Sequence, residues 1–223
     1  NETAIIFYDT ATDPYDANYD FSTTNWNYQL QPTLTSLIGE ANYDIGHLFG
    51  ASGGGGNAGC IGCVCVSAAT GALGKGSGIT SPADGVPAGD NFDVDYVVHE
   101  MGHQMGARHT FTYGEAGSSG EDSTVNVEPG SGVTIMGYAG ITNDSTSATP
   151  TTDVALHSIP IFAYRSILQI QTNLATKSCP VSTAITNGLS VSVPAASYTI
   201  PKGTAFILTG SGNAASYVWE END

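Results

Sequence analysis

The chain has 223 residues, and 21 acidic residues against 5 lysines and arginines give it a formal net charge of −16 at pH 7. So few cations exclude nucleic acids and anionic membranes as binding partners, because surfaces that bind phosphates carry clustered lysine and arginine. The 40% hydrophobic content is that of a folded chain, and no apolar run approaches the ~20 residues that a membrane-spanning helix needs.

The first fifty residues predict two strands and one helix. The apolar run Thr3–Tyr8 indicates a buried strand, and an acidic turn region at residues 9–20 follows it. Between Tyr28 and Gly39, apolar residues recur at helical spacing and predict a helix that ends at the glycine. Tyr43–Phe49 predicts a second strand.

The middle of the chain predicts a strand and a helix. The glycine run Gly53–Gly56 is expected to hold no regular structure, because glycine loses the most conformational freedom on folding. Ala58–Val66, directly after it, predicts a strand. A helix is expected to begin after Asp93, which suits an N-cap position. Its core-facing apolar stripe, at i, i+4, i+7 and i+11, consists of Val94, Val98, Met101 and Met105.

The last sixty residues predict a second helix and then a change of character. The helix is expected over Ile159–Ala175, and strands are expected at Leu189–Val193 and Ala205–Leu208. We therefore expect one domain over residues 1–180 and a β-rich tail over residues 181–223. Because about forty residues cannot bury a β-sandwich core alone, the tail is either a truncated β domain or a hairpin that leans on the main domain.

One motif carries chemistry. It reads His-Glu-Met-Gly-His-Gln-Met-Gly-Ala-Arg-His and begins at His99. On a helix, His99 and His103 project from one face about a turn apart, as a tetrahedral zinc site requires. Glu100 lies beside such a metal, where its carboxylate can hydrogen-bond a bound water. Gly106 tolerates the positive φ that turns the chain back, so that His109 supplies a third imidazole.

The extended motif HExxHxxGxxH is much more specific than HExxH, and it resembles the signature of the metzincin zinc peptidases. Metzincins also have a methionine turn below the metal, and Met136, 27 residues after His109, is similarly placed. The sequence around it, 128–140, resembles bacterial members of the reprolysin, or adamalysin-type, branch. The alternative interpretation is that these are surface histidines on a capped helix, and it assigns no function to the motif residues.

The resemblance covers most of residues 1–180 and implies a two-lobed α/β (α+β) catalytic domain with a mixed twisted sheet and an active-site helix. The sequence departs from adamalysins at Thr110, where they have aspartate. Tyr138 instead resembles the tyrosine of the astacin and serralysin turn. It is a candidate fifth ligand or a phenol that hydrogen-bonds the tetrahedral intermediate, and the alternative is a tyrosine that packs below the site.

The same resemblance implies further features. The substrate is expected to pair with the edge strand Ala58–Cys65, and Gly137–Gly140 are expected to form part of the wall of the specificity pocket. Four cysteines allow three pairings, and the resemblance favours Cys65–Cys179 with Cys60–Cys63 as a local bridge. Relatives have a strand and a helix before the region of Thr3–Tyr8, so an N-terminal fragment or propeptide of the same precursor is an expected partner.

A zinc ion on three imidazoles leaves one position for water, whose pKa falls to roughly 7. Glu100 then takes the proton of this water as it attacks the peptide carbonyl and passes it to the leaving amine. We therefore predict a secreted, monomeric zinc endopeptidase that acts on protein or peptide substrates. Secretion agrees with an even cysteine count and with a sequence that starts at Asn1 without a leader. The alternatives are a catalytically silent zinc-containing binding or adhesion module and a zinc hydrolase of a non-peptide amide.

Other polar residues have weaker expectations. Asp13, Asp16 and Asp20 are candidates for a calcium site, although no EF-hand loop is present and solvated turn acids are the alternative. His47 is expected to pack within its strand. His157 is expected to be an ordinary polar residue before the second helix.

Overall fold

The computed structural model describes residues 5–7, 9, 11–69, 71–112, 122–142, 153–194 and 197–220. Its backbone contacts divide the chain into two compact units, residues 1–180 with 222–223 and residues 181–221. Among the described helices, none has both the length and the apolar character to cross a membrane.

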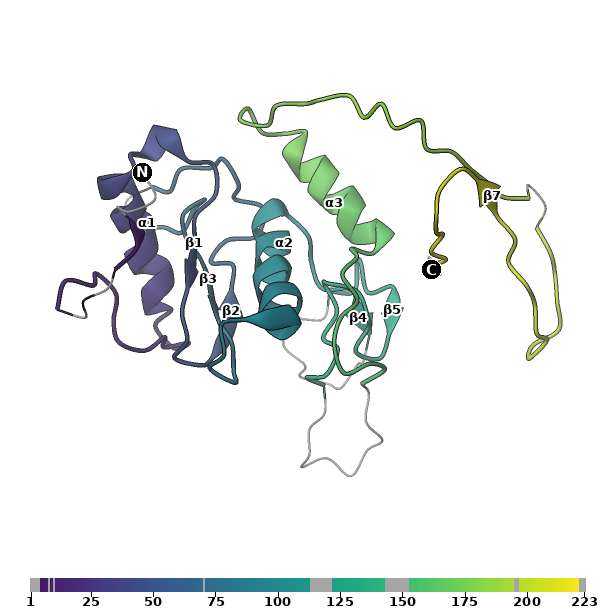
Figure 1. The fold of residues 1–223 in the computed structure, drawn as a ribbon, viewed down its shortest axis with the longest axis horizontal. Coiled ribbons are helices and arrows are strands. Elements are labelled where there is room, and N and C mark those ends of the chain that lie inside the picture. Colours follow the sequence, from purple (N-terminus) through teal and green to yellow (C-terminus); the bar gives the residue numbers. More distant parts are fainter. Residues whose placement is uncertain are drawn as a thin grey trace. The chain divides into compact units, whose positions relative to one another are not determined.

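The first unit contains a three-stranded mixed sheet of order β1-β3-β2. The central strand β3 (Gly78–Ser81) is buried at every residue; it runs parallel to β1 (His47–Phe49) and antiparallel to β2 (Gly55–Asn57). In the view of Figure 1 these strands are drawn between helices α1 and α2. The mixed α/β class expected from the resemblance is confirmed.

Helix α1 (Asn25–Leu37) confirms the first predicted helix, although it begins three residues earlier than Tyr28. Its Trp26 and Leu30 are 5% and 2% exposed and belong to the core, whereas Leu37, also part of the predicted apolar spacing, is 45% exposed. After it, Gly39 has a φ of 88°, a value that disfavours side-chain-bearing residues, so the glycine marks the end of the element. The short 3-10 helix η2 (Glu40–Asn42) follows.

Two strand predictions near the N-terminus are wrong in whole or in part. Of Thr3–Tyr8, the structure describes residues 5–7, which form no strand; Ile5 and Ile6 are about half exposed, since no described strand pairs with them. Thr3, Ala4 and Tyr8 lie outside the described residues. Tyr43–Phe49 is a strand only over β1, and the chain bends at Asp44 before it.

The predictions for the glycine run and for the segment after it are both wrong: part of the run is a strand, and the segment after it is not. The run contributes to β2, whose backbone pairs with Ser81, Thr80 and Ile79, because a ladder needs only backbone groups. Ala58–Val66 is not a strand but a series of turns. Gly59, Gly62 and Cys65 have φ values of 70°, 74° and 64°, which are incompatible with extended chain.

The motif helix is longer than predicted and begins with a different winding. The π-helix η3 (Asn91–Val98) leads into α2 (His99–Met105), so Asp93 lies inside the helical segment and the predicted N-cap is wrong. Val94 and Val98 pack against a buried cluster of Ala107, Ile135 and Met136, which confirms the core-facing role of this part of the stripe. Helix α2 ends as predicted at Gly106, with φ 116°.

Helix α3 (Tyr164–Leu174) is shorter at its start than the predicted Ile159–Ala175. Residues 159–161 are not helical, because their backbone groups pair elsewhere: the Ile159 N–H donates to Val133 O at 2.8 Å, and the Ile135 N–H donates to Ile161 O at 3.0 Å. At the other end, the Asn173 amide donates to the carbonyl oxygens of Met105 and Gly62. A two-stranded parallel ladder, β4 (Phe111–Thr112) with β5 (Glu128–Pro129), completes the unit.

Both expected disulfides, Cys65–Cys179 and Cys60–Cys63, are present, so the pairing is confirmed. In the second unit, β6 (Val191–Ser192) pairs antiparallel with β7 (Ser211–Gly212). The predicted strand Leu189–Val193 survives only as β6, and Ala205–Leu208 is not a strand. The apolar side chains of both segments stay exposed, as expected for a two-stranded ribbon, which buries little apolar surface.

Candidate metal centre and active site

Three imidazoles meet at the end of the motif helix. His99 and His103 lie one turn apart on α2 and are both buried, and the turn at Gly106 brings His109 back to them. The Nε2 atom of His109 lies 3.3 Å from Nε2 of His99 and 2.9 Å from Nε2 of His103. One nitrogen from each ring lies within 4.8 Å of the others, so the group could hold a metal ion.

The hydrogen bonds of the outer ring nitrogens support this interpretation. His99 Nδ1 lies 2.6 Å from the Ile135 carbonyl oxygen, and His103 Nδ1 lies 2.8 Å from that of Ala107. A carbonyl can only accept, so each Nδ1 carries the proton and each Nε2 presents a lone pair. Burial lowers the pKa of His99 to about 4 and that of His103 well below its usual value, so both rings are neutral. Lone pairs that converge in this way favour a cation.

The donor set fits zinc. A tetrahedral ion with Zn–N bonds of about 2.0–2.1 Å separates its nitrogen ligands by roughly 3.3–3.4 Å, close to the His99–His109 distance. Among the described residues, one other group of potential ligands has comparable spacing, Asp44 with Cys65 and Cys179. Its sulfur atoms are joined in a disulfide and are therefore not thiolate ligands.

Glu100 lies beside the three imidazoles and is not part of that ligand group. It is 8% exposed, and burial raises the pKa of its carboxyl to about 8, partly opposed by a hydrogen bond from the Ala58 backbone. A methyl group at Gly56 would overlap the Glu100 side chain. The glycine in β2 therefore lets this carboxylate lie directly against the edge strand.

The methionine turn lies below the site, as the resemblance implies. Met136 is fully buried, and a methyl group at Gly102 would approach its sulfur to 2.6 Å, so the absence of a side chain there admits the methionine against α2. The Thr110 N–H donates to the Met136 carbonyl oxygen at 3.2 Å. The turn is thus attached to the residue that follows His109.

Glu128 is a further residue of the site that the sequence did not reveal, and its buried carboxylate joins the two segments around the site. One oxygen accepts hydrogen bonds from the backbone of Val133 and Thr134 at 2.9 and 3.0 Å. The other accepts the hydroxyls of Thr110 and Thr134. Thr110, the residue after His109, is thus held by a carboxylate from the β5 segment. The signal was weak, because Glu128 is 18 residues from Thr110.

Tyr138 is close to the metal centre. The centre of its ring lies 4.6 Å from that of His109, 5.7 Å from that of His99 and 4.3 Å from that of Phe111. The structure therefore brings this predicted catalytic residue together with the imidazoles.

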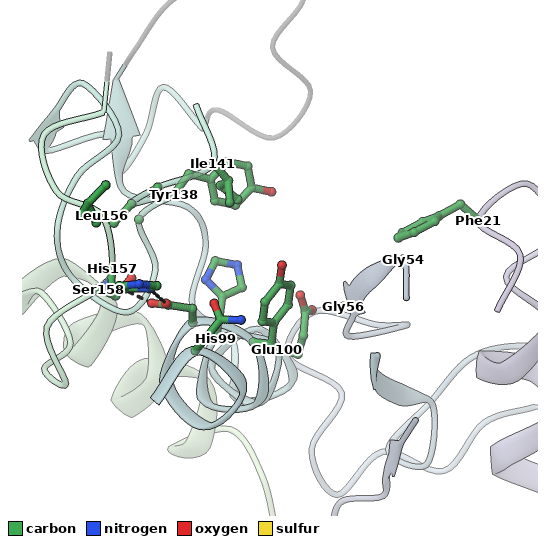
Figure 2. A pocket seen from close by; sticks show the side chains of 16 residues that line it. Phe21, Gly54, Gly56, His99, Glu100, Tyr138, Ile141, Leu156, His157 and Ser158 are labelled. Carbon is green, nitrogen blue, oxygen red and sulfur yellow. Dashed lines mark hydrogen bonds and ion pairs between the residues drawn. The ribbon is translucent and has the colours of Figure 1, made fainter. Parts of the chain in front are cut away.

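A cavity of about 300 Å³ opens over His99 and Glu100. Figure 2 shows Phe21 and Gly54 on one side of these two residues, and Leu156, His157 and Ser158 on the other. The expected pocket wall, Gly137–Gly140, is part of the lining. A second cavity of about 230 Å³ is lined by His103, His109 and the turn around Cys60; Gly56, Glu100 and Tyr138 line both cavities.

The turn that carries Cys60 is fixed to the end of the motif helix. The Gly62 N–H donates to His103 O at 2.9 Å, and the Val64 N–H donates to Gln104 O at 3.2 Å. The carbonyl oxygens of the last turn of a helix lack the usual partners within the helix, and these two bonds use that accepting capacity, although His103 O also accepts the Gly106 N–H. The wall of the second cavity is therefore continuous with α2.

The two remaining histidines have defined partners. His157 Nδ1 lies 2.8 Å from the Asp95 carboxylate, which also accepts the Ser158 N–H, so this pair connects the cavity wall at residues 157–158 to η3. The contact was not predicted from the sequence, because His157 and Asp95 are 62 positions apart. His47 lies in β1 as expected. Its nitrogens contact Gln104 and Thr80 at 2.7 and 2.8 Å, and burial lowers its pKa to about 4.

The candidate calcium ligands are used locally. Asp13 and Asp20 accept backbone N–H groups of Tyr15 and Ser22, and Asp16 accepts the Asn25 amide. Within the described ranges, none of the three acids belongs to a group of ligands close enough to share an ion.

Comparison with known proteins agrees with this geometry. The family model for metallopeptidase family M12B, reprolysin-like, matches residues 1–187. Neither curated proteins nor solved structures gave a match.

Proposed function

Because the chain belongs to the reprolysin-like M12B family of metallopeptidases, we propose that it is a secreted zinc endopeptidase that cleaves peptide bonds within proteins or peptides. The observation that carries the proposal is the convergence of three imidazoles beside the buried side chain of Glu100. His99, His103 and His109 would be the zinc ligands. A zinc ion there would supply Lewis-acid chemistry, polarising the scissile carbonyl and acidifying a water molecule.

Glu100 would act as the general base. Its carboxylate lies against β2 in both cavities, so it faces the place where an extended substrate would lie. It would accept the proton of the attacking water and then donate it to the leaving amine. Its burial keeps bulk water from competing for the same oxygen atoms.

Tyr138 would assist. Its ring is within contact range of His99 and His109 and lines both cavities. A phenol in this position can hydrogen-bond the oxyanion that develops at the carbonyl carbon. A Tyr138→Phe variant separates this role from simple packing, because it removes the hydroxyl and keeps the ring.

The substrate would add a strand to the sheet at β2 (Gly55–Asn57), and this replaces the predicted edge strand Ala58–Cys65. β2 is an end strand of the three-stranded sheet and runs past Glu100. Backbone pairing is tolerant of sequence, so selectivity would come from side-chain pockets. Two disulfides agree with an extracellular location, and a monomer with a precursor-derived N-terminal fragment or propeptide remains part of the proposal.

The test is hydrolysis of casein and of quenched fluorescent peptides by the purified protein. We expect cleavage that a chelator abolishes and that one equivalent of zinc restores. A chelator-resistant activity, or stoichiometric zinc without hydrolysis of any peptide, would contradict the proposal. The second result would favour a silent binding module, and cleavage restricted to non-peptide amides would favour the other alternative.

A further inference from the structure

The two ends of the cavity over Glu100 differ chemically. Leu156 and the Asp95–His157 pair form one end. At the opposite end Figure 2 shows Phe21 beside Gly54. Phe21 is 53% exposed, although transfer of an aromatic ring from water to an apolar environment is favourable. The second end is thus an uncovered apolar surface within the candidate active site.

Two aromatic rings border this end. A methyl group placed on Gly55 would lie 3.8 Å from Phe21 Cζ and 3.8 Å from Tyr96 Cε1. The bare backbone of β2 therefore runs between a ring from the N-terminal loop and a ring from η3. Tyr19 packs edge-on against Phe21, with ring centres 4.7 Å apart, which helps to hold the Phe21 ring in place. The result is a slot with aromatic walls and no side chain on its floor.

The slot is close to the proposed reaction centre. Gly56, the next residue of β2, is the one at which a side chain would overlap Glu100. A chain paired with β2 advances about 3.3 Å per residue. A substrate side chain in the slot would therefore come from within about two residues of the peptide bond that is hydrolysed beside Glu100.

Charge restricts the occupant further. Asp20 is the neighbour of Phe21, and its hydrogen bonds from Ser22 lower the pKa of its carboxyl, so it stays ionised. Asp95 lines the same cavity, at the end that holds Leu156 and His157. An acidic side chain would meet like charges there and would gain nothing from the aromatic walls.

We propose that Phe21 and Tyr96 form a subsite that selects a bulky apolar side chain of the substrate, separate from the residue that contacts Leu156. This inference rests on the proposed peptidase function and adds its substrate preference. The glycines of β2 leave the room that such a side chain needs.

The experiment uses a series of quenched peptides in which Phe, Leu, Gly or Asp occupies each of three positions on either side of the cleaved bond. At one position we expect kcat/KM to be about tenfold higher for Phe than for Gly, and lowest for Asp. Phe21→Ala should bring this Phe-to-Gly ratio close to one, and Tyr96→Leu should lower it. Tyr28→Ala is the matched control, because Tyr28 is 47% exposed on α1 and lines a different cavity.

The ratio is independent of the fraction of active enzyme, so a variant that folds poorly still gives an answer. A wild-type ratio near one at every position would overturn the subsite while leaving the peptidase function intact. A ratio that neither Phe21→Ala nor Tyr96→Leu changes would do the same. Absence of any chelator-sensitive cleavage would overturn the peptidase function and the subsite with it.

Discussion

The segment His99–Tyr138 and the segment Val181–Glu220 are similar in length but differ in how they use their side chains. In the described part of the first, Phe111 and Met136 are fully buried, and the acidic side chain Glu128 has four hydrogen bonds. In the second, Ile207 is 90% exposed. Apolar content alone therefore does not make a core. The segment that satisfies its buried polar groups is the one that contains the candidate site.

The largest expected difference between the two segments is in activity. Glu100→Gln removes the proposed base but keeps its shape, so we expect peptide hydrolysis to fall by about 10²–10⁴-fold with zinc content unchanged. Glu220→Gln is the matched change in the second segment, and it should leave hydrolysis at the wild-type level. Turnover and zinc content of both variants test the comparison. Wild-type turnover by the Glu100 variant would remove this residue from the mechanism.

The next difference is in stability, and a pair of phenylalanines measures it. Phe111→Ala leaves a cavity beside Tyr138 and should lower the free energy of unfolding by about 3–5 kcal/mol. Phe206 is 65% exposed, so Phe206→Ala should change it by less than about 0.5 kcal/mol. Urea unfolding of both variants gives the two values. Equal losses would show that the second segment has a core of its own.

A smaller effect is expected at Glu128. Glu128→Gln replaces one accepting oxygen by a donating amide that faces donors, so we expect a loss of about 3 kcal/mol in the free energy of unfolding. Because Glu128 joins the Thr110 segment to the methionine turn, zinc affinity should fall as well, measured by competition with a chromophoric chelator at a temperature where the variant is folded. Lower stability with unchanged zinc affinity would limit Glu128 to a scaffold role.

The smallest effect concerns pH and belongs to His47. Its pKa is lowered to about 4 in the folded protein, against an ordinary value of 6.5, so between these values the unfolded chain binds more protons. The contribution of His47 to the free energy of unfolding is therefore fully present above pH 6.5, and it declines as the pH falls toward 4. The contribution of His47 to the loss of stability between pH 7 and pH 5 should be about 2 kcal/mol, in addition to any contribution from the buried His99 and His103. Urea unfolding at both values checks this, and His47→Gln should reduce the loss.

The site was more predictable from the sequence than the fold around it. Helix geometry fixes how the side chains of His99, Glu100 and His103 lie relative to one another. Gly106 indicates the turn that leads to His109. These are local relations that a sequence displays directly. The functions of Glu128 and His157 depend instead on partners 18 and 62 residues away, and no local pattern encodes such contacts.

The sheet was misjudged for a related reason. Strand prediction relies on side-chain alternation, and β2 is built from Gly55 and Gly56, which have no side chains to alternate. β2 is a strand because its backbone pairs with that of β3, and the sequence does not show this pairing. Conversely, the apolar Ala58–Val66 has a strand-like composition, but left-handed residues such as Gly62 and Cys65 exclude an extended chain.

The hydrogen bonds from Gly62 and Val64 to the last carbonyls of α2 have a consequence for how a substrate would enter. They make one side of the cleft and the helix that presents His103 a single rigid body, closed further by the Cys60–Cys63 bridge. This side of the cleft is therefore already formed before a substrate binds. The conformational entropy of ordering it is lost when the chain folds and not when a peptide binds. Peptides that dock on that side should therefore associate without a slow rearrangement step.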